Sequence, residues 1–134
     1  MSATLPEEIR AVMENGVPVV LATCSADGVP NVSVVSEVYW VDAGRVALSF
    51  QFFSKTIRNV RENPRAQLIL NDHAAGRRWV LDLAYDHSET EGPVFDAMEM
   101  QIEAIASVTG MSGIFKLHAA DLYRVLAVER VTQG

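Results

Sequence analysis

The amino-acid sequence predicts an α+β protein in which six or seven mostly antiparallel strands form a small β-barrel with two or three helices. Apolar stretches of strand length follow one another, separated by turns rich in Gly, Asp and Asn. Helical periodicity appears at only two or three places, so the strands are not linked by crossover helices. Successive hairpins without crossovers favour closure into a barrel over an open parallel sheet.

The length and composition of the chain predict a single domain over residues 1–134. Of the 134 residues, 49% are hydrophobic and 21% are charged, which is enough apolar material for a core. The one cysteine, Cys24, excludes an internal disulfide framework, and its apolar surroundings predict a buried side chain. There is no basic start followed by an apolar core, and no run of roughly 20 apolar residues. We therefore expect a cytoplasmic protein without a membrane segment.

The chain is expected to begin with a short helix. Thr4 and Glu7 have the spacing of a capping box, and Pro6 suits the first helical turn. An Asn-Gly pair at 15–16 ends the helical pattern. The apolar stripe of this helix consists of Ile9, Val12 and Met13.

Three strands are predicted between this helix and residue 50. Residues 17–25 are nearly all apolar, which predicts a strand buried on both faces. The turn at 26–28 leads into a strand over 30–41, and these two strands should form a hairpin. A second turn at 42–44 leads into the third strand, over 45–50.

The second half of the chain is expected to hold further strands and one longer helix. Residues 66–71 alternate, and the strand after the turn at 74–76 has one apolar face. The helix begins at the Gly-Pro pair 92–93 and ends at Gly110. Two more strands are expected at 113–117 and 122–131. The inward apolar residues are Trp79, Leu81, Leu83 and Tyr85 of the strand and Phe95, Met98, Ile102 and Ile105 of the helix.

The stretch 49–65 predicts a phosphate site, because a strand ends at a Ser-Lys-Thr step that opens a short basic helix. Ser54 is a good N-cap, and the amides of Lys55, Thr56 and Ile57 lack intrahelical acceptors. These amides could hold an anion at the positive end of the helix, where Lys55 adds a charge and Thr56 a hydroxyl. The alternative is an ordinary solvated helix with a serine cap.

The distribution of charge favours a phosphorylated ligand. Residues 55–78 hold six of the eleven basic residues beside Glu62 and Asp72, so this window carries +4 while the rest of the chain carries −10. A compact positive patch is predicted in an otherwise acidic protein. Such a patch suits a small phosphorylated ligand better than a nucleic acid, which needs basic charge over a long surface.

The order of these features resembles the pyridoxamine 5'-phosphate oxidase-like, FMN-binding split-barrel family over nearly the whole chain. The first hairpin of that family is similar to Leu21-Ala22-Thr23 with the turn sequence 26–30. Its phosphate-binding helix is similar to Ser54-Lys55-Thr56 with 58–65. The segments 88–93, 110–113 and 121–125 resemble a subgroup whose members are often joined to sensory GAF domains.

The resemblance implies where FMN would bind. The FMN phosphate would lie on Ser54, Lys55 and Thr56, with Ser49 and Phe50 near the ribityl chain or the ring. Ser33 to Ser36 would pass along the flavin through backbone and hydroxyl contacts.

The chain also departs from the pattern of the family's oxidases. Trp79 stands where those enzymes place a polar residue toward the cofactor, so it either stacks on the cofactor or only packs. The Arg and Lys with which they grip the flavin correspond to the neighbourhood of Val32 and Glu37, which argues against a true pyridoxamine phosphate oxidase.

The function expected from the sequence is an FMN-binding oxidoreductase that acts on an unknown small-molecule substrate. The resemblance also implies a homodimer, and no nucleic-acid or membrane partner is expected. The first alternative is a flavin-binding sensor or carrier without turnover. The second is a split barrel that binds deazaflavin or haem. His73, His87 and His118 are isolated and lack metal-ligand spacing, so no metal site is expected.

Overall fold

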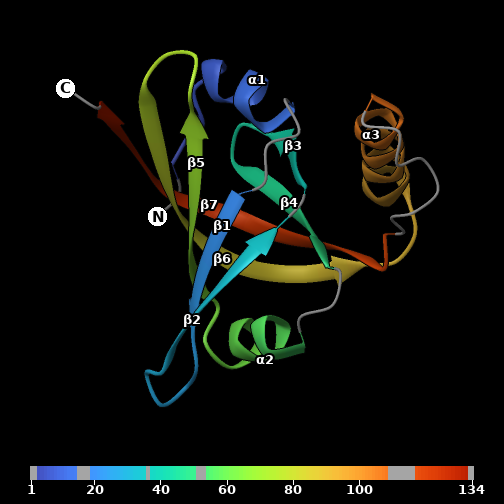
Figure 1. Ribbon diagram of the computed structural model, residues 1–134. Coiled ribbons are helices and arrows are strands. Elements are labelled where there is room, and N and C mark those ends of the chain that lie inside the picture. The colour runs from blue at the N-terminus through green and yellow to red at the C-terminus, as the bar shows by residue number, and fades with distance from the viewer. Residues whose placement is uncertain (1–2, 15–18, 36, 51–53, 109–116, 133–134) are drawn as a thin grey trace.

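The computed structural model describes residues 3–14, 19–35, 37–50, 54–108 and 117–132. Within these ranges seven strands form one antiparallel sheet in the order β2-β1-β5-β6-β7-β4-β3, with three helices around it (Figure 1). The expected α+β fold of antiparallel strands is confirmed. The elements are α1 (Glu8–Glu14), β1 (Val19–Cys24), β2 (Pro30–Val35), β3 (Val38–Asp42), β4 (Arg45–Phe50), α2 (Ser54–Glu62), β5 (Arg65–Asp72), β6 (Arg77–Glu89), α3 (Pro93–Val108) and β7 (Ala119–Thr132).

The single strand expected over 30–41 is wrong, because the chain forms two strands there. β2 pairs with β1, whereas β3 pairs with β4, so consecutive strands lie at opposite ends of the sheet order. Val35 and Val38 are both buried although they are three positions apart, which one regular strand with a two-residue repeat does not allow. The alternation therefore shifts by one residue between them, and the sheet curves into a barrel.

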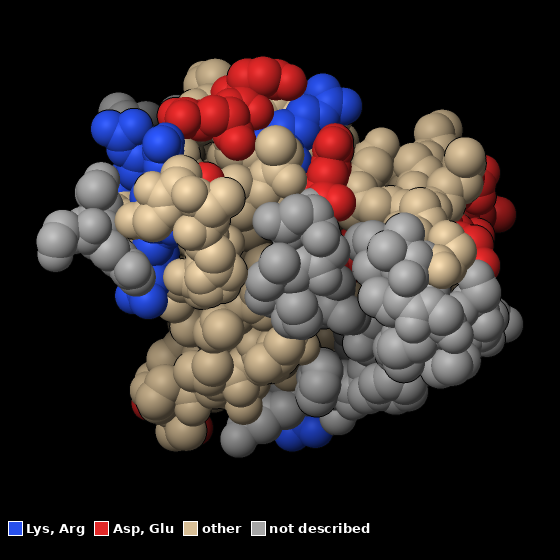
Figure 2. Space-filling model, turned by 45° about the horizontal axis from the view of Figure 1, so that its top comes forward, with Lys and Arg blue, Asp and Glu red and all other residues tan. Residues whose placement is uncertain are grey.

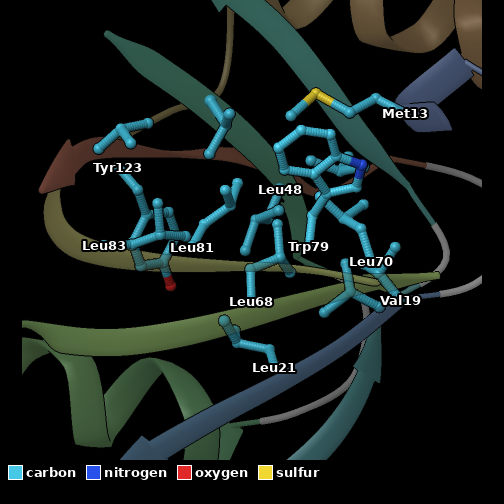
Figure 3. Packing of buried hydrophobic residues seen from close by; sticks show 14 of the residues in the cluster. Met13, Val19, Leu21, Leu48, Leu68, Leu70, Trp79, Leu81, Leu83 and Tyr123 are labelled. Carbon is cyan, nitrogen blue, oxygen red and sulfur yellow. The ribbon is translucent and has the colours of Figure 1, made fainter. Parts of the chain in front are cut away.

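The interior of the barrel is apolar, and a helix lies at each end of it. Core side chains from β1, β4, β5, β6 and β7 meet in Figure 3, and many of them are completely buried. α1 covers one end through Ile9 and Met13, while α2 lies at the opposite end (Figure 1). The labelled core residues are Met13, Val19, Leu21, Leu48, Leu68, Leu70, Trp79, Leu81, Leu83 and Tyr123.

The first strand is not buried on both faces. Val19, Leu21 and Thr23 of β1 are buried, but the alternate residues Val20, Ala22 and Cys24 are only half-buried. The expectation of a buried Cys24 is therefore wrong. An apolar run signals two apolar faces, but no described helix lies over the outer face of β1.

The third helix packs on the outside of the barrel. The predicted stripe is confirmed for Phe95, Met98 and Ile102, which pack with residues of β3, β4 and β7. The Ile105 side chain, the expected helix end at Gly110 and residues 113–116 of the strand expected over 113–117 lie outside the described residues. None of the described helices combines the length and apolarity needed to cross a membrane.

Candidate functional site

The expected phosphate helix begins where the sequence places it. α2 starts at Ser54, shortly after the end of β4, and its Val60 is buried against the barrel. The first backbone amides of an α-helix have no intrahelical acceptor, and the helix dipole makes this end positive. The side chains of Ser54 and Lys55 lie outside the described residues.

Two of the predicted site residues meet at this end of the barrel. The Thr56 hydroxyl donates to Ser33 Oγ at 3.2 Å, and Asn31 Nδ2 donates to Thr56 Oγ1 at 3.2 Å. Thr56 therefore uses its one hydroxyl proton on β2, and its backbone amide is the group left for an anion. The prediction missed Asn31, although its position two residues before Ser33 places both on one face of β2.

A second polar contact joins the same helix to β1. Asn59 Nδ2 donates to Thr23 Oγ1 at 3.2 Å, and both side chains are buried. Asn59 lies three residues after Thr56, so both project from one side of α2. The two contacts form a polar seam between α2 and the β1–β2 hairpin, defined by Thr23, Asn31, Ser33, Thr56 and Asn59.

Ser49, at the end of β4, lies beside a buried carboxyl group. Its backbone N–H donates to the carbonyl of Glu37 at 3.3 Å, so the two residues occupy the ladder position next to the Val38–Leu48 pair. Ser49 Oγ and Glu37 Oε1 are both buried and have no hydrogen-bond partner in the part of the chain that the structure describes. Ser36 and the Phe50 side chain lie outside that part.

Glu37 was not predicted as a site residue. Its Oε2 accepts a hydrogen bond from Gln101 Nε2 of α3 at 2.9 Å, and the side chain is 3% exposed. Burial raises the pKa of Glu37 to about 8, and the bond from Gln101 opposes this rise. The sequence carries no local signal for this contact, because 64 positions separate the two residues.

The structure places Trp79 in the core. Its side chain is 3% exposed and lies beside Met13 of α1 in Figure 3. This is the α1 end of the barrel, and the polar seam is at the α2 end (Figure 1). Of the two roles that the sequence left open, the structure shows packing, and it does not bring Trp79 to the other predicted site residues.

The structure removes Arg77 and Arg78 from the compact positive patch expected from residues 55–78. Arg77 pairs with Glu8 of α1 at 3.0 Å, and Arg78 Nε donates to Asn71 Oδ1 at 3.1 Å, both at the end of β5 far from α2. β5 has eight residues, which at roughly 3.3 Å each separate its two ends by about 25 Å. Figure 2 accordingly shows basic side chains in separate groups on the face in view.

A buried carboxyl group inside the barrel was also missed. Ser88 Oγ donates to Asp121 Oδ1 at 2.6 Å, and the Tyr85 hydroxyl lies 2.5 Å from Ser88 Oγ. Burial raises the pKa of Asp121, while the bond from Ser88 and the charge of Arg61 on α2 oppose the rise.

The outer face of the sheet carries a shallow pocket of about 370 Å³, lined in part by Cys24, Arg65 and Asp82. Asp82 Oδ1 accepts a hydrogen bond from Gln67 at 2.9 Å. Among the described residues, no group of three or more His, Cys, Asp or Glu side chains is placed to hold a metal ion. The pocket is lined by both apolar and polar residues, among them Ala22, Pro30 and Gln67.

Comparison with known proteins gives one curated relative and several solved structures of the same fold. Uncharacterized protein MJ0282 of Methanocaldococcus jannaschii is 41% identical over 66 residues, which is 48% of this chain. The match spans 44% of that relative, so the chain aligns with less than half of its length.

The solved structures share the fold at low sequence identity. An FMN-binding protein from Syntrophomonas wolfei subsp. wolfei has a TM-score of 0.76 at 15% identity, covering 96% of this chain and 86% of its own. An F420 reductase has a TM-score of 0.69 at 16% identity, covering 93% and 98%. The haem storage protein HutZ of Vibrio cholerae has a TM-score of 0.59 at 21% identity, covering 98% and 93%.

The family model described as pyridoxamine 5'-phosphate oxidase matches residues 5–126, which include every described strand up to the middle of β7 and the whole polar seam. The expected family is confirmed, and none of these comparisons bears on the expected GAF-joined subgroup. The chain belongs to the pyridoxamine 5'-phosphate oxidase family.

Proposed function

We propose that the protein binds FMN at the α2 end of the barrel and acts as an FMN-dependent oxidoreductase on a small organic substrate. The observation that carries this proposal is the contact between Ser33 and Thr56, which fixes the N-terminal turn of α2 against β2. The family membership and the fold shared with an FMN-binding protein support it.

The residues at this end fit the polar groups of FMN. The backbone amides of the first turn of α2 and the charge of Lys55 would hold the phosphate, with Ser54 as the cap. The buried hydroxyl of Ser49 has no partner among the described residues. We expect Ser49, Phe50 and Ser36 to lie toward the ribityl chain or the ring. FMN itself would supply the electron transfer, and the protein would bind, orient and shield it.

The proposal includes a homodimer in the cytoplasm, built from a single domain over residues 1–134. The outer face of the β1–β2 hairpin supports the dimer, because Val32 is 66% exposed and Val34 is 56% exposed on adjacent outward positions. Exposed apolar side chains that share one sheet face are typical of an interface. The single cysteine is compatible with a reducing compartment.

The second candidate is a flavin-binding sensor or carrier that does not turn over. The composition of the polar seam favours it, because its side chains are neutral hydroxyls and amides bonded to one another. None of them is an acid or base that could exchange a proton with a substrate at neutral pH. Deazaflavin and haem are alternative ligands, since an F420 reductase and a haem storage protein share the fold.

The visible absorption spectrum of the purified protein, followed by titration with FMN, F420 and haemin, tests the ligand. Tight FMN binding with the flavin bands at about 370 and 450 nm supports the proposal. Binding of haemin or F420 alone contradicts it. Oxidation of NADH or NADPH with added acceptors then separates the candidates, because turnover linked to flavin reduction excludes the pure carrier.

A further inference from the structure

We infer that Glu37 and Gln101 form a pH-sensitive latch, which holds α3 against the barrel while the Glu37 carboxyl is protonated and releases the helix when it ionises. This inference concerns how α3 is held in the protein without FMN, since Ser49 belongs both to the surroundings of Glu37 and to the proposed FMN site.

The latch stands at the joint between β2 and β3. Because Val38 points into the barrel, the alternation of the strand turns Glu37 to the outer face, which α3 covers. Gln101 Nε2 donates both to Glu37 Oε2 at 2.9 Å and to the Val38 carbonyl at 3.1 Å. One side chain of α3 therefore binds the backbone and the carboxyl group of the same joint.

Apolar side chains also contribute to this contact. Phe95, Met98 and Ile102 of α3 pack with Ala47, Ala120 and Leu122 of the sheet. Apolar packing has no dependence on proton concentration, and it cannot solvate a charge. Of the bridge and this apolar packing, the bridge is therefore the part that responds to pH.

The surroundings of Glu37 hold its proton. Facing it are Gln101 from α3 and Ser49 from β4, with Tyr39 next along the same face of β3 and Ala120 beyond Ser49 on β7. Among the described residues no basic side chain shifts the pKa of Glu37, since only burial and the bond from Gln101 do so. The acidic residues of α3 have exposed side chains, and β6 contributes an acid beside Ala120. These acids are Asp96, Glu99 and Glu103 of α3 and Glu89 of β6.

The neutral form fits the observed bonding. With Oε2 accepting from Gln101, the proton is on Oε1, the oxygen that has no partner among the described residues. Ser49 Oγ, on the facing ladder position, is buried and equally without a described partner, so a small rotation would let it accept this proton. Ionisation would leave a charge there for which the described residues provide no compensating cation.

The direction of the pH effect follows from the two protonation equilibria. With α3 closed, the pKa of Glu37 is about 8, whereas in water the group would titrate near 4.5. Between these pH values, opening of α3 releases one proton, so its equilibrium constant should rise roughly tenfold per pH unit. The rise should end above about pH 8, where both states are ionised.

Hydrogen exchange of the backbone amides in the middle of α3, corrected for the intrinsic rate at each pH, tests the latch in the full-length protein. The protection factors should fall about tenfold per pH unit between roughly pH 5 and 8. They should also stay below those of the β6–β7 amides. Equal protection of α3 and β6–β7 at every pH would show that α3 opens only with global unfolding, and would overturn the latch.

Two variants sharpen this test. Glu37→Gln keeps the shape and stays neutral, so the pH dependence of α3 protection should disappear. Gln101→Leu removes the bridge, so the protection of α3 should be lower at every pH, while its dependence on pH should remain. This second variant provides the test if Glu37→Gln does not fold. A wild-type profile without slope, or the wild-type slope in folded Glu37→Gln, contradicts the proposal.

Discussion

At the scale of single residues, short neutral side chains that are already paired build the α2 end of the barrel. Thr56 donates to Ser33 and accepts from Asn31, and Asn59 donates to Thr23. Such a seam orients the helix but adds no charge. In the proposed FMN site, the attraction for the phosphate would therefore come from the helix N-terminus and from Lys55.

Replacing Ser54 and Lys55 together by alanine should weaken FMN binding by about 2 to 4 kcal/mol, because charge-assisted hydrogen bonds are lost. Titration of the flavin absorbance measures the affinity, and circular dichroism checks the fold. Arg78→Ala is the matched control, since Arg78 bonds to Asn71 at the other end of β5 and should not affect FMN. Unchanged affinity in the folded double variant would place the phosphate elsewhere.

Thr56→Val separates the hydroxyl of this residue from its backbone amide. The variant loses the bonds to Ser33 and Asn31, so unfolding in urea should show a loss of about 1 kcal/mol in stability. FMN affinity should change less than threefold, because the amide remains. A tenfold or larger loss of affinity would show that the hydroxyl binds the phosphate directly.

At the scale of elements, α3 depends on a small apolar contact. Met98 is completely buried in this contact, whereas Met100, two positions along the same helix, is 75% exposed. Substitutions of these two methionines therefore compare a buried with an exposed position of the same helix.

Met98→Ala should cost about 2 to 4 kcal/mol of unfolding free energy, because the variant leaves a cavity between α3 and the sheet. Met100→Ala should stay within about 0.5 kcal/mol of the parent protein. Urea unfolding of both variants measures the difference. Equal effects of the two substitutions would mean that α3 does not pack on the sheet through Met98.

Local patterns predicted the elements better than the joints between them. Arg45–Phe50 and the start of α2 at Ser54 follow directly from turn, strand and cap signals. The break at Glu37 could not be predicted, because it depends on β3 pairing with β4 rather than continuing β2. Charge counted along the chain likewise suggested one patch, although Arg65 of β5 and Arg78 of β6, which pairs with Asn71, lie near opposite ends of the β5–β6 ladder.

At the scale of the whole molecule, the outer face of β1 and β2 is less buried than the sequence predicts. The sequence predicted both faces of β1 to be covered, and the structure covers one. The apolar residues of the outer face, together with the exposed Val32 and Val34 of β2, would be covered by a second copy of the chain.

Val32→Asp with Val34→Asp should convert the proposed dimer into a folded monomer, because two charges would be buried in the interface. Light scattering after gel filtration measures the mass. Met100→Asp places a charge on an exposed apolar position of α3 and should leave the dimer intact. A monomeric parent protein, or a double variant that remains dimeric, would contradict this interface.

The joint between β2 and β3 also limits which changes in length the chain can accept. Two residues separate Val35 from Val38, and this number turns both valines toward the core. An insertion or deletion of one residue here would rotate every β3 side chain to the opposite face of its strand. The turn around Gly28 is exposed and carries no such constraint. A library of single-residue insertions should therefore lose nearly all variants at the joint and retain those at the turn.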